Sequence, residues 1–133
     1  MRLAPVCERL IDQAPALGGR VLAALSGAVP AAYPAAYVLL LAEAVTDGVI
    51  AGPARVIEAR FGVELMARHA AQAGSGGPAQ DHMEDLREAI LAALVGYAPG
   101  GGVSPIAHTG GKLISFDAGL AVWRDEFTVT FTR

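Results

Sequence analysis

The chain has 133 residues, about the usual length of one domain, and 53% of them are hydrophobic against 17% charged, which excludes a disordered chain. Ten basic residues stand against thirteen acidic ones, so a net charge of −3 supplies no basic patch for the phosphates of a nucleic acid. Because Cys7 is the only cysteine, an intrachain disulfide is excluded and the composition suits a reducing, cytoplasmic compartment. We expect a single α+β domain spanning residues 1–133.

Apolar residues near the N-terminus recur at the spacing of one helix face, and they are Leu3, Val6, Cys7, Leu10 and Ile11. Charged residues occupy the opposite face, so the stretch lacks the unbroken apolar run of a secretory signal. Pro5 fits the first turn of this helix, and Pro15 with Gly18 and Gly19 predicts where it ends. Cys7 is interpreted as a buried, inert thiol.

The next uncharged stretch, Val21 to Ala42, is long enough to cross a bilayer as a helix. Pro30 and Pro34 interrupt it and no basic cluster flanks it, so we expect no membrane span. The apolar run from Ala35 to Glu43 predicts a strand buried on both faces. Residues 46–53 contain glycine, aspartate and proline and predict a connecting loop.

The clearest strand signal covers residues 55–69, where apolar and polar residues alternate. The predicted core positions are Ile57, Ala59, Phe61, Val63, Leu65 and Ala67. The positions between them predict a solvated face, and they are Glu58, Arg60, Gly62, Glu64, Met66 and Arg68. Such alternation is typical of an antiparallel sheet, and a bend is expected near Gly62.

A glycine loop at residues 74–77 precedes Pro78, which predicts the first turn of a second helix that Gly96 closes. Its buried stripe is expected to contain Met83, Leu86, Ile90, Leu94 and Tyr97. A second glycine cluster at residues 100–102 separates this helix from the last third of the chain.

The last third predicts a β-hairpin that turns around Asp117 to Gly119. In its second arm the inward positions are Trp123, Phe127, Val129 and Phe131, and Asp125 breaks this set, which indicates a bulge or an edge. The opposite, polar side is expected to carry Arg124, Glu126, Thr128, Thr130 and Thr132. The predicted fold is therefore α+β, with an antiparallel, possibly mixed, sheet of about four strands and two helices packed on it.

The sequence contains no recognisable catalytic, cofactor or metal motif. Neither glycine cluster is followed by the lysine and hydroxyl residue of a phosphate-binding loop. His69, His82 and His108 have no carboxylate or cysteine at ligand spacing beside them. The acidic run from Asp81 to Glu88 around Arg87 is interpreted as a solvated helix face. We expect no enzyme activity and no cofactor or metal.

Several short patterns together carry a resemblance: Arg60-Phe61-Gly62-Val63, then Leu86-Arg87 leading to residues 93–97 and Pro99, then Gly110-Gly111 with Leu113, and finally Trp123, Asp125 and Phe127. In these residues and in the order of its elements, nearly the whole chain resembles the bacteriophage tail terminator family, which includes siphophage minor tail proteins of the U type. The resemblance implies a structural protein of the virion, assembled in the host cytoplasm.

What the family implies is a ring, commonly of six copies, that caps the head-proximal end of the tail tube, stops its growth and offers a surface for head joining. The implied partners are the chain itself, the tail tube protein and a head completion or connector protein, with no sequence-specific nucleic acid and no membrane. A ring needs two complementary patches on each copy. We expect these among the charged residues of the long strand and the glycine loops: Glu58, Arg60, Glu64, Arg68, Gly76, Gly77 and Gly101.

Six copies carry a formal charge of −18, six times −3, so an acidic lumen that repels passing DNA is expected. Three alternatives stay open at this point. They are another head-to-tail joining protein, a small enzyme or ligand-binding domain that uses a pocket beneath the sheet, and a regulator or toxin-neutralising module of a mobile element.

Overall fold

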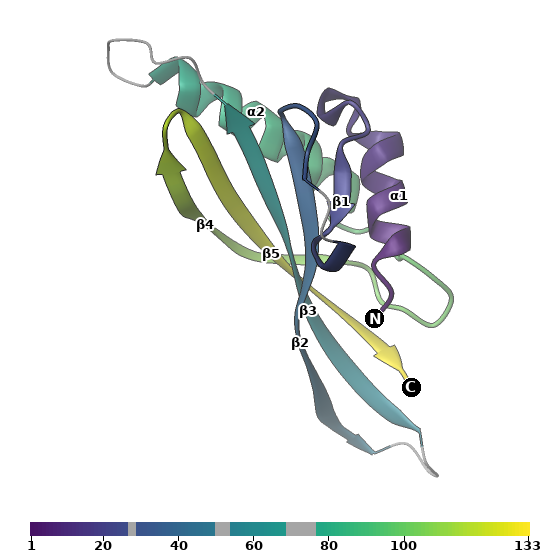
Figure 1. Cartoon of the computed structure of the whole chain (residues 1–133). Helices are drawn as coiled ribbons and strands as arrows, with labels where there is room; N and C mark the ends of the chain where they lie inside the picture. The colour runs from purple at the N-terminus through teal and green to yellow at the C-terminus, as the bar shows by residue number, and fades with distance from the viewer. Residues whose placement is uncertain (27–28, 50–53, 69–76) are drawn as a thin grey trace.

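The structure is a computed structural model, and it describes residues 1–26, 29–49, 54–68 and 77–133 (Figure 1). One five-stranded sheet has the order β1-β2-β3-β5-β4, with β1 parallel to β2 and every other pair antiparallel. The elements are α1 (Ala4–Gln13), β1 (Val21–Ala23), β2 (Ala35–Val49), β3 (Arg55–Arg68), α2 (Gly77–Leu94), β4 (Ala107–Asp117) and β5 (Leu120–Thr132).

The predicted α+β class is confirmed, but the sheet has five strands rather than about four, and it is mixed. The additional strand is β1, which has only three residues and lies between two 3-10 turns, Pro15–Leu17 and Ala24–Ser26. So short a strand leaves no alternation to recognise in the sequence, and its pairing with residues 36–38 of β2 is decided by tertiary contact.

Helix α1 begins and ends close to where the sequence predicts. Val6 and Leu10 are fully buried, and Pro5 occupies its first turn. The helix packs against α2, where the Arg9 Nε donates a hydrogen bond to the Ala93 carbonyl at 2.9 Å. Cys7 is half-buried rather than buried, and desolvation raises the pKa of its thiol.

Strand β2 starts at Ala35 as predicted but continues to Val49, so the expected loop is wrong for residues 46–49, while residues 50–53 lie outside the described part of the chain. Nor is β2 covered on both faces, because Leu40 is 42% exposed and Val45 is 63% exposed. Figure 1 shows β2 and β3 continuing together past the two helices, so the far half of β2 has no layer to bury it.

The alternating strand is confirmed as β3, which lies between β2 and β5. All six predicted core residues are buried, but Gly62 and Met66 of the predicted solvated face are buried as well. At the level of the expected bend the irregularity lies in β2, where the register shifts between Leu40 and Ala42. The bulged β2 residue, Leu41, packs near Gly62.

The C-terminal half also follows the predicted order. The stripe of α2 is buried at Met83, Leu86, Ile90 and Leu94, and Tyr97 is half-buried. The hairpin turns through two residues with positive φ, Ala118 at 50° and Gly119 at 80°. The expectation of a bulge or an edge at Asp125 is wrong, because β5 lies between β3 and β4 and the bulges are in β4.

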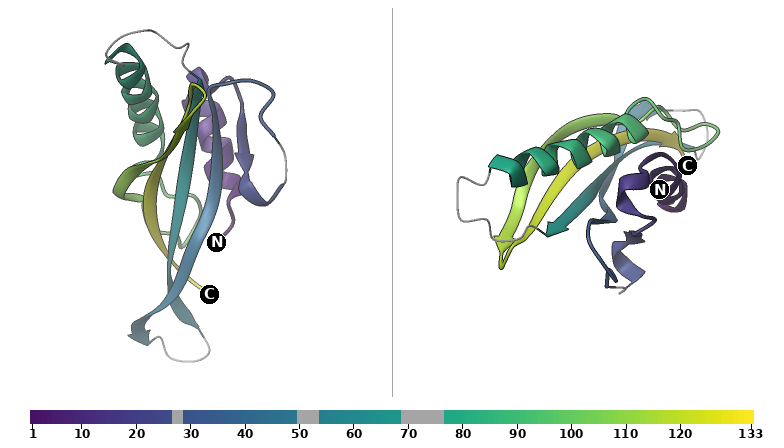
Figure 2. Two further views of the ribbon diagram at one scale, coloured as in Figure 1. Left: turned by 60° about the vertical axis from the view of Figure 1, so that its left-hand side comes forward. Right: turned by 90° about the horizontal axis from the view of Figure 1, so that it is seen from above.

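Both helices cover one face of the twisted sheet, as the views in Figure 2 show. The core lies between the two layers, and Phe61 of β3 stacks on Phe127 of β5 with ring centroids 5.2 Å apart. Within the described ranges, no helix is long and apolar enough to cross a membrane.

Candidate assembly surface

The face of the sheet that lies opposite the helices carries charged side chains of both signs. We call it the open face, and its rows on the two central strands are Glu58, Arg60, Gly62, Glu64, Met66 and Arg68 of β3, and Leu120, Val122, Arg124, Glu126, Thr128 and Thr130 of β5. Strand alternation and the register of the two strands bring these rows side by side. All four charged residues that the sequence predicted for the interface therefore share one face.

Two ion pairs cross from β3 to β5 on the open face. Arg60 Nη1 lies 3.8 Å from Glu126 Oε1, and Arg124 Nη2 lies 3.4 Å from Glu64 Oε2. Arg68 donates a hydrogen bond to the Ala118 carbonyl at 3.3 Å, and its guanidinium lies 5.3 Å from the centre of the Tyr33 ring, just before β2. Partly exposed pairs of this kind contribute little to stability.

Arg124 and Glu126 are the partners that sequence reasoning missed. Their parity in β5 placed them on the polar side, but only the register of β5 against β3 shows which charges they meet. The stem of Arg124 lies directly over Gly62, where a Cβ would be 3.3 Å from both Cγ and Cδ of the arginine. A small residue at 62 therefore allows the arginine to lie flat on the sheet.

The predicted glycines do not form one site. Gly77 is the first residue of α2 rather than part of a loop, and Gly76 lies outside the described residues. Gly101 is exposed in the turn that precedes β4, where Val103 N donates to the Gly100 carbonyl at 3.2 Å. Gly101 thus remains a candidate contact, but it lies in a turn and not in the strands that form the open face.

Beneath α2, on the helix-covered face, a buried ionic cluster surrounds Asp125, which is 2% exposed. Arg87 of α2 donates to both carboxylate oxygens, from Nη2 at 2.9 Å and from Nε at 3.1 Å. His108 Nε2 of β4 lies 3.0 Å from the same carboxylate. The Arg87 guanidinium also binds Glu84 and lies 4.3 Å from the centre of the Trp123 ring.

These neighbours stabilise the ionised form of the Asp125 carboxyl group. Burial acts to raise the pKa of its carboxyl, but the hydrogen bonds from Arg87 and His108 outweigh burial and lower that pKa below its usual value. The hydrogen bond to Asp125 in turn raises the pKa of Arg87. The cluster therefore joins α2 to β5 through the Arg87–Asp125 ion pair and reaches β4 through His108. The interpretation of Arg87 as part of a solvated helix face is wrong.

Close packing around this cluster requires a glycine at position 111. A Cβ there would overlap Asp125 Oδ1 and would lie only 2.7 Å from Trp123 Nε1. Gly111 belongs to the Gly110-Gly111 pair of β4. The sequence alone did not show that this pair packs closely against Asp125 and Trp123.

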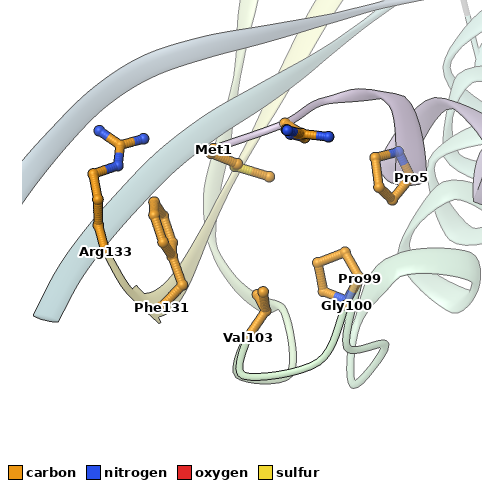
Figure 3. Close-up of a pocket in the computed structure, with 8 residues that line it drawn as sticks. Met1, Pro5, Pro99, Gly100, Val103, Phe131 and Arg133 are labelled. Atoms are coloured by element: carbon orange, nitrogen blue, oxygen red, sulfur yellow. The ribbon is translucent and has the colours of Figure 1, made fainter.

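A cavity of about 320 Å³ lies near both ends of the chain, next to the turn that contains Gly101. Figure 3 shows Pro5, Pro99, Val103 and Phe131 around it, with Arg133 at one side. The Met1 amine and Arg133 both bind Glu43 of β2 there, and the hydrogen bond from the amine lowers the pKa of Glu43. The cavity is lined mainly by apolar side chains, together with Arg2 and Arg133.

Among the residues that the structure describes, no group of three or more histidine, cysteine or carboxylate side chains is placed to hold a metal ion. His108 lies beside the Asp125 carboxylate, 17 residues away in the sequence, and that carboxylate is already bound by Arg87.

The sequence matches the model of one protein family, described as phage tail terminator protein, over residues 1–133. The comparison with curated proteins gives no match. Among solved structures, the fold is similar to a chain in the virion of a native gene transfer agent particle, with a TM-score of 0.68 and 20% sequence identity. The alignment covers 98% of this chain and 93% of that chain.

Proposed function

Because this chain belongs to the phage tail terminator family, we propose that it forms a ring that caps the head-proximal end of a tail tube, stops tube polymerisation and offers the surface for head joining. The full-length family match carries the proposal, since it includes every element of the sheet and both helices. The proposed partners are further copies of the chain, the tail tube protein and a head completion or connector protein.

The open face gives this role a physical basis. Both signs of charge are present on one surface, on Glu58, Arg60, Glu64 and Arg68. Complementary charges across an interface between proteins contribute more to the specificity of docking than to its affinity. We place these residues, with Gly101, at contacts between copies or with the tube. Six copies together carry a formal charge of −18, six times −3. DNA would pass through the lumen of the ring that they form.

The decisive experiment measures the mass of the purified protein by analytical ultracentrifugation, alone and with tail tube protein. A ring, or a tube whose growth stops when the protein is added, supports the proposal. A monomer that leaves tube growth unchanged refutes it and favours a binding domain or an enzyme. Tube lengths in electron micrographs provide the independent readout.

A further inference from the structure

The outer edge of β4 is an unpaired strand edge that is exposed to solvent. β4 is the last strand of the sheet order, and each of its residues from Ala107 to Asp117 except Gly110 is exposed. Three large apolar side chains on it reach solvent, with Leu113 at 55%, Ile114 at 40% and Phe116 at 62% exposure. Long exposed strands with apolar side chains pair readily with other chains, and folded proteins usually protect them.

The opposite edge of the sheet is also unprotected over most of its length. β1 pairs only with residues 36–38 of β2, so residues 39–49 have no strand beside them on that side within the described chain. Leu40 and Val45 are exposed there, at 42% and 63%. Leu25 is fully exposed in the 3-10 turn that contacts β2 and adds to this apolar edge.

We propose that these two edges bind each other in successive copies of the chain, so that β4 of one copy pairs with residues 39–49 of β2 in the next. The inference rests on the ring proposed above and identifies the surfaces that close it. The edges differ from each other and lie at opposite ends of the strand order, which is the arrangement that a head-to-tail ring requires.

Strand direction supports this pairing. β2, β3, β5 and β4 are successively antiparallel, so β2 and β4 run in opposite directions. When a second copy continues the sheet in the same orientation, its β2 therefore lies antiparallel to β4 of the first. Antiparallel pairs form the slightly more stable type of ladder.

One charged contact between the two edges is available. Residues 39–49 contain no basic residue and two acidic ones, Asp47 and Glu43, of which Glu43 already binds the Met1 amine and Arg133. β4 contains Asp117 and Lys112, the only lysine of the chain, and Lys112 makes no ion pair among the described residues. Its two register shifts limit the length of a regular ladder, so the apolar side chains at 113, 114 and 116 supply a large part of the contact.

The test uses one charged variant at each edge, Phe116→Lys and Val45→Lys. Both side chains are more than half exposed, so the variants should fold, and circular dichroism and urea unfolding check this. Ile11→Lys and Val95→Lys are matched controls, because those side chains are similarly exposed, at 47% and 49%, but lie outside both edges. Leu113→Lys and Leu25→Lys are the second choices if an edge variant misfolds.

Sedimentation is measured for each protein alone, in mixtures and with tail tube protein. Each edge variant should remain a monomer where the wild type and the controls form rings, with an apparent Kd raised about tenfold or more. A mixture of the two edge variants should give a dimer and nothing larger, because each contributes one intact edge.

The outcomes separate the two proposals. Rings formed equally well by the edge variants and the wild type overturn the edge assignment and leave the ring intact. A mixture of edge variants that yields no dimer also overturns the head-to-tail pairing. A wild type that does not assemble, even on tube protein, overturns both.

Discussion

Replacing Arg87 by methionine tests the buried cluster that joins α2 to the sheet. Methionine keeps the apolar stem and removes the guanidinium, so Asp125 stays at 2% exposure without the two hydrogen bonds that hold its charge. Breaking a buried ion pair by removing one partner costs about 3–5 kcal/mol. Because His108 still binds the carboxylate and Arg87 itself is 15% exposed, we expect the lower end, about 3 kcal/mol.

The assay is urea unfolding followed by the fluorescence of Trp123, the only tryptophan, which lies 4.3 Å from the Arg87 guanidinium. With an m-value of about 2 kcal/mol per molar urea, the midpoint should fall by roughly 1.5 M. Arg60→Met is the matched control, since its pair with Glu126 is long, at 3.8 Å, and its side chain is 54% exposed. That change should cost no more than about 0.5 kcal/mol.

The pH dependence of the same variant has a definite sign. In the wild type the pKa of Asp125 is lowered, so its contribution is complete above the unfolded-state pKa of about 3.9 and is lost as pH falls through the folded-state pKa. Without Arg87, burial raises that pKa and protonation relieves the unpaired charge. The stability difference between the two proteins should therefore be largest near neutral pH and shrink in acid.

Two results would refute this reasoning. One is a cost below about 1 kcal/mol, which is the value of an exposed pair. The other is an Arg87→Met/Asp125→Asn double variant no more stable than Arg87→Met, because removal of the stranded charge should recover part of the loss.

Three further predictions concern single positions. Ala118→Gly should raise the free energy of unfolding by about 1 kcal/mol, because alanine holds a φ of 50° in the hairpin turn, and an unchanged melting temperature would contradict this. Gly111→Ala should cost at least about 2 kcal/mol in urea unfolding, since its Cβ would lie 2.7 Å from Trp123 Nε1, whereas Gly101→Ala, with nothing within 4 Å, should cost less than about 0.5 kcal/mol. Cys7 should react with a thiol reagent more slowly than a free cysteine at pH 7, because burial raises its pKa, and urea should abolish the difference.

Asp125 is a residue whose burial, but not its partner, can be predicted from the sequence. Its position among inward-facing residues was visible from the alternation of β5, and a buried carboxylate needs a partner. The partner, Arg87, is 38 residues away on another element, and nothing local in the sequence joins the two. The same holds for Arg124 and Glu126, whose sidedness was predicted but whose partners depend on the register of two strands 60 residues apart.

Strand β2 shows the second limit. Its apolar run predicted burial, but Leu40 and Val45 are exposed because the strand extends beyond the helical layer. Whether an apolar strand is covered depends on where other elements end, and hydrophobicity alone does not contain that information.

The sequence by itself determined the order of the helices and main strands, the side of β3 that enters the core, and the family to which the chain belongs. These follow from periodicity, from breakers such as Pro15 and Gly96, and from local motifs, all of which act over a few residues. The tertiary structure alone decided the fifth strand, the partners of the charged residues and the two unprotected edges. Each of these depends on contacts between distant segments, which form only when the whole sheet is assembled.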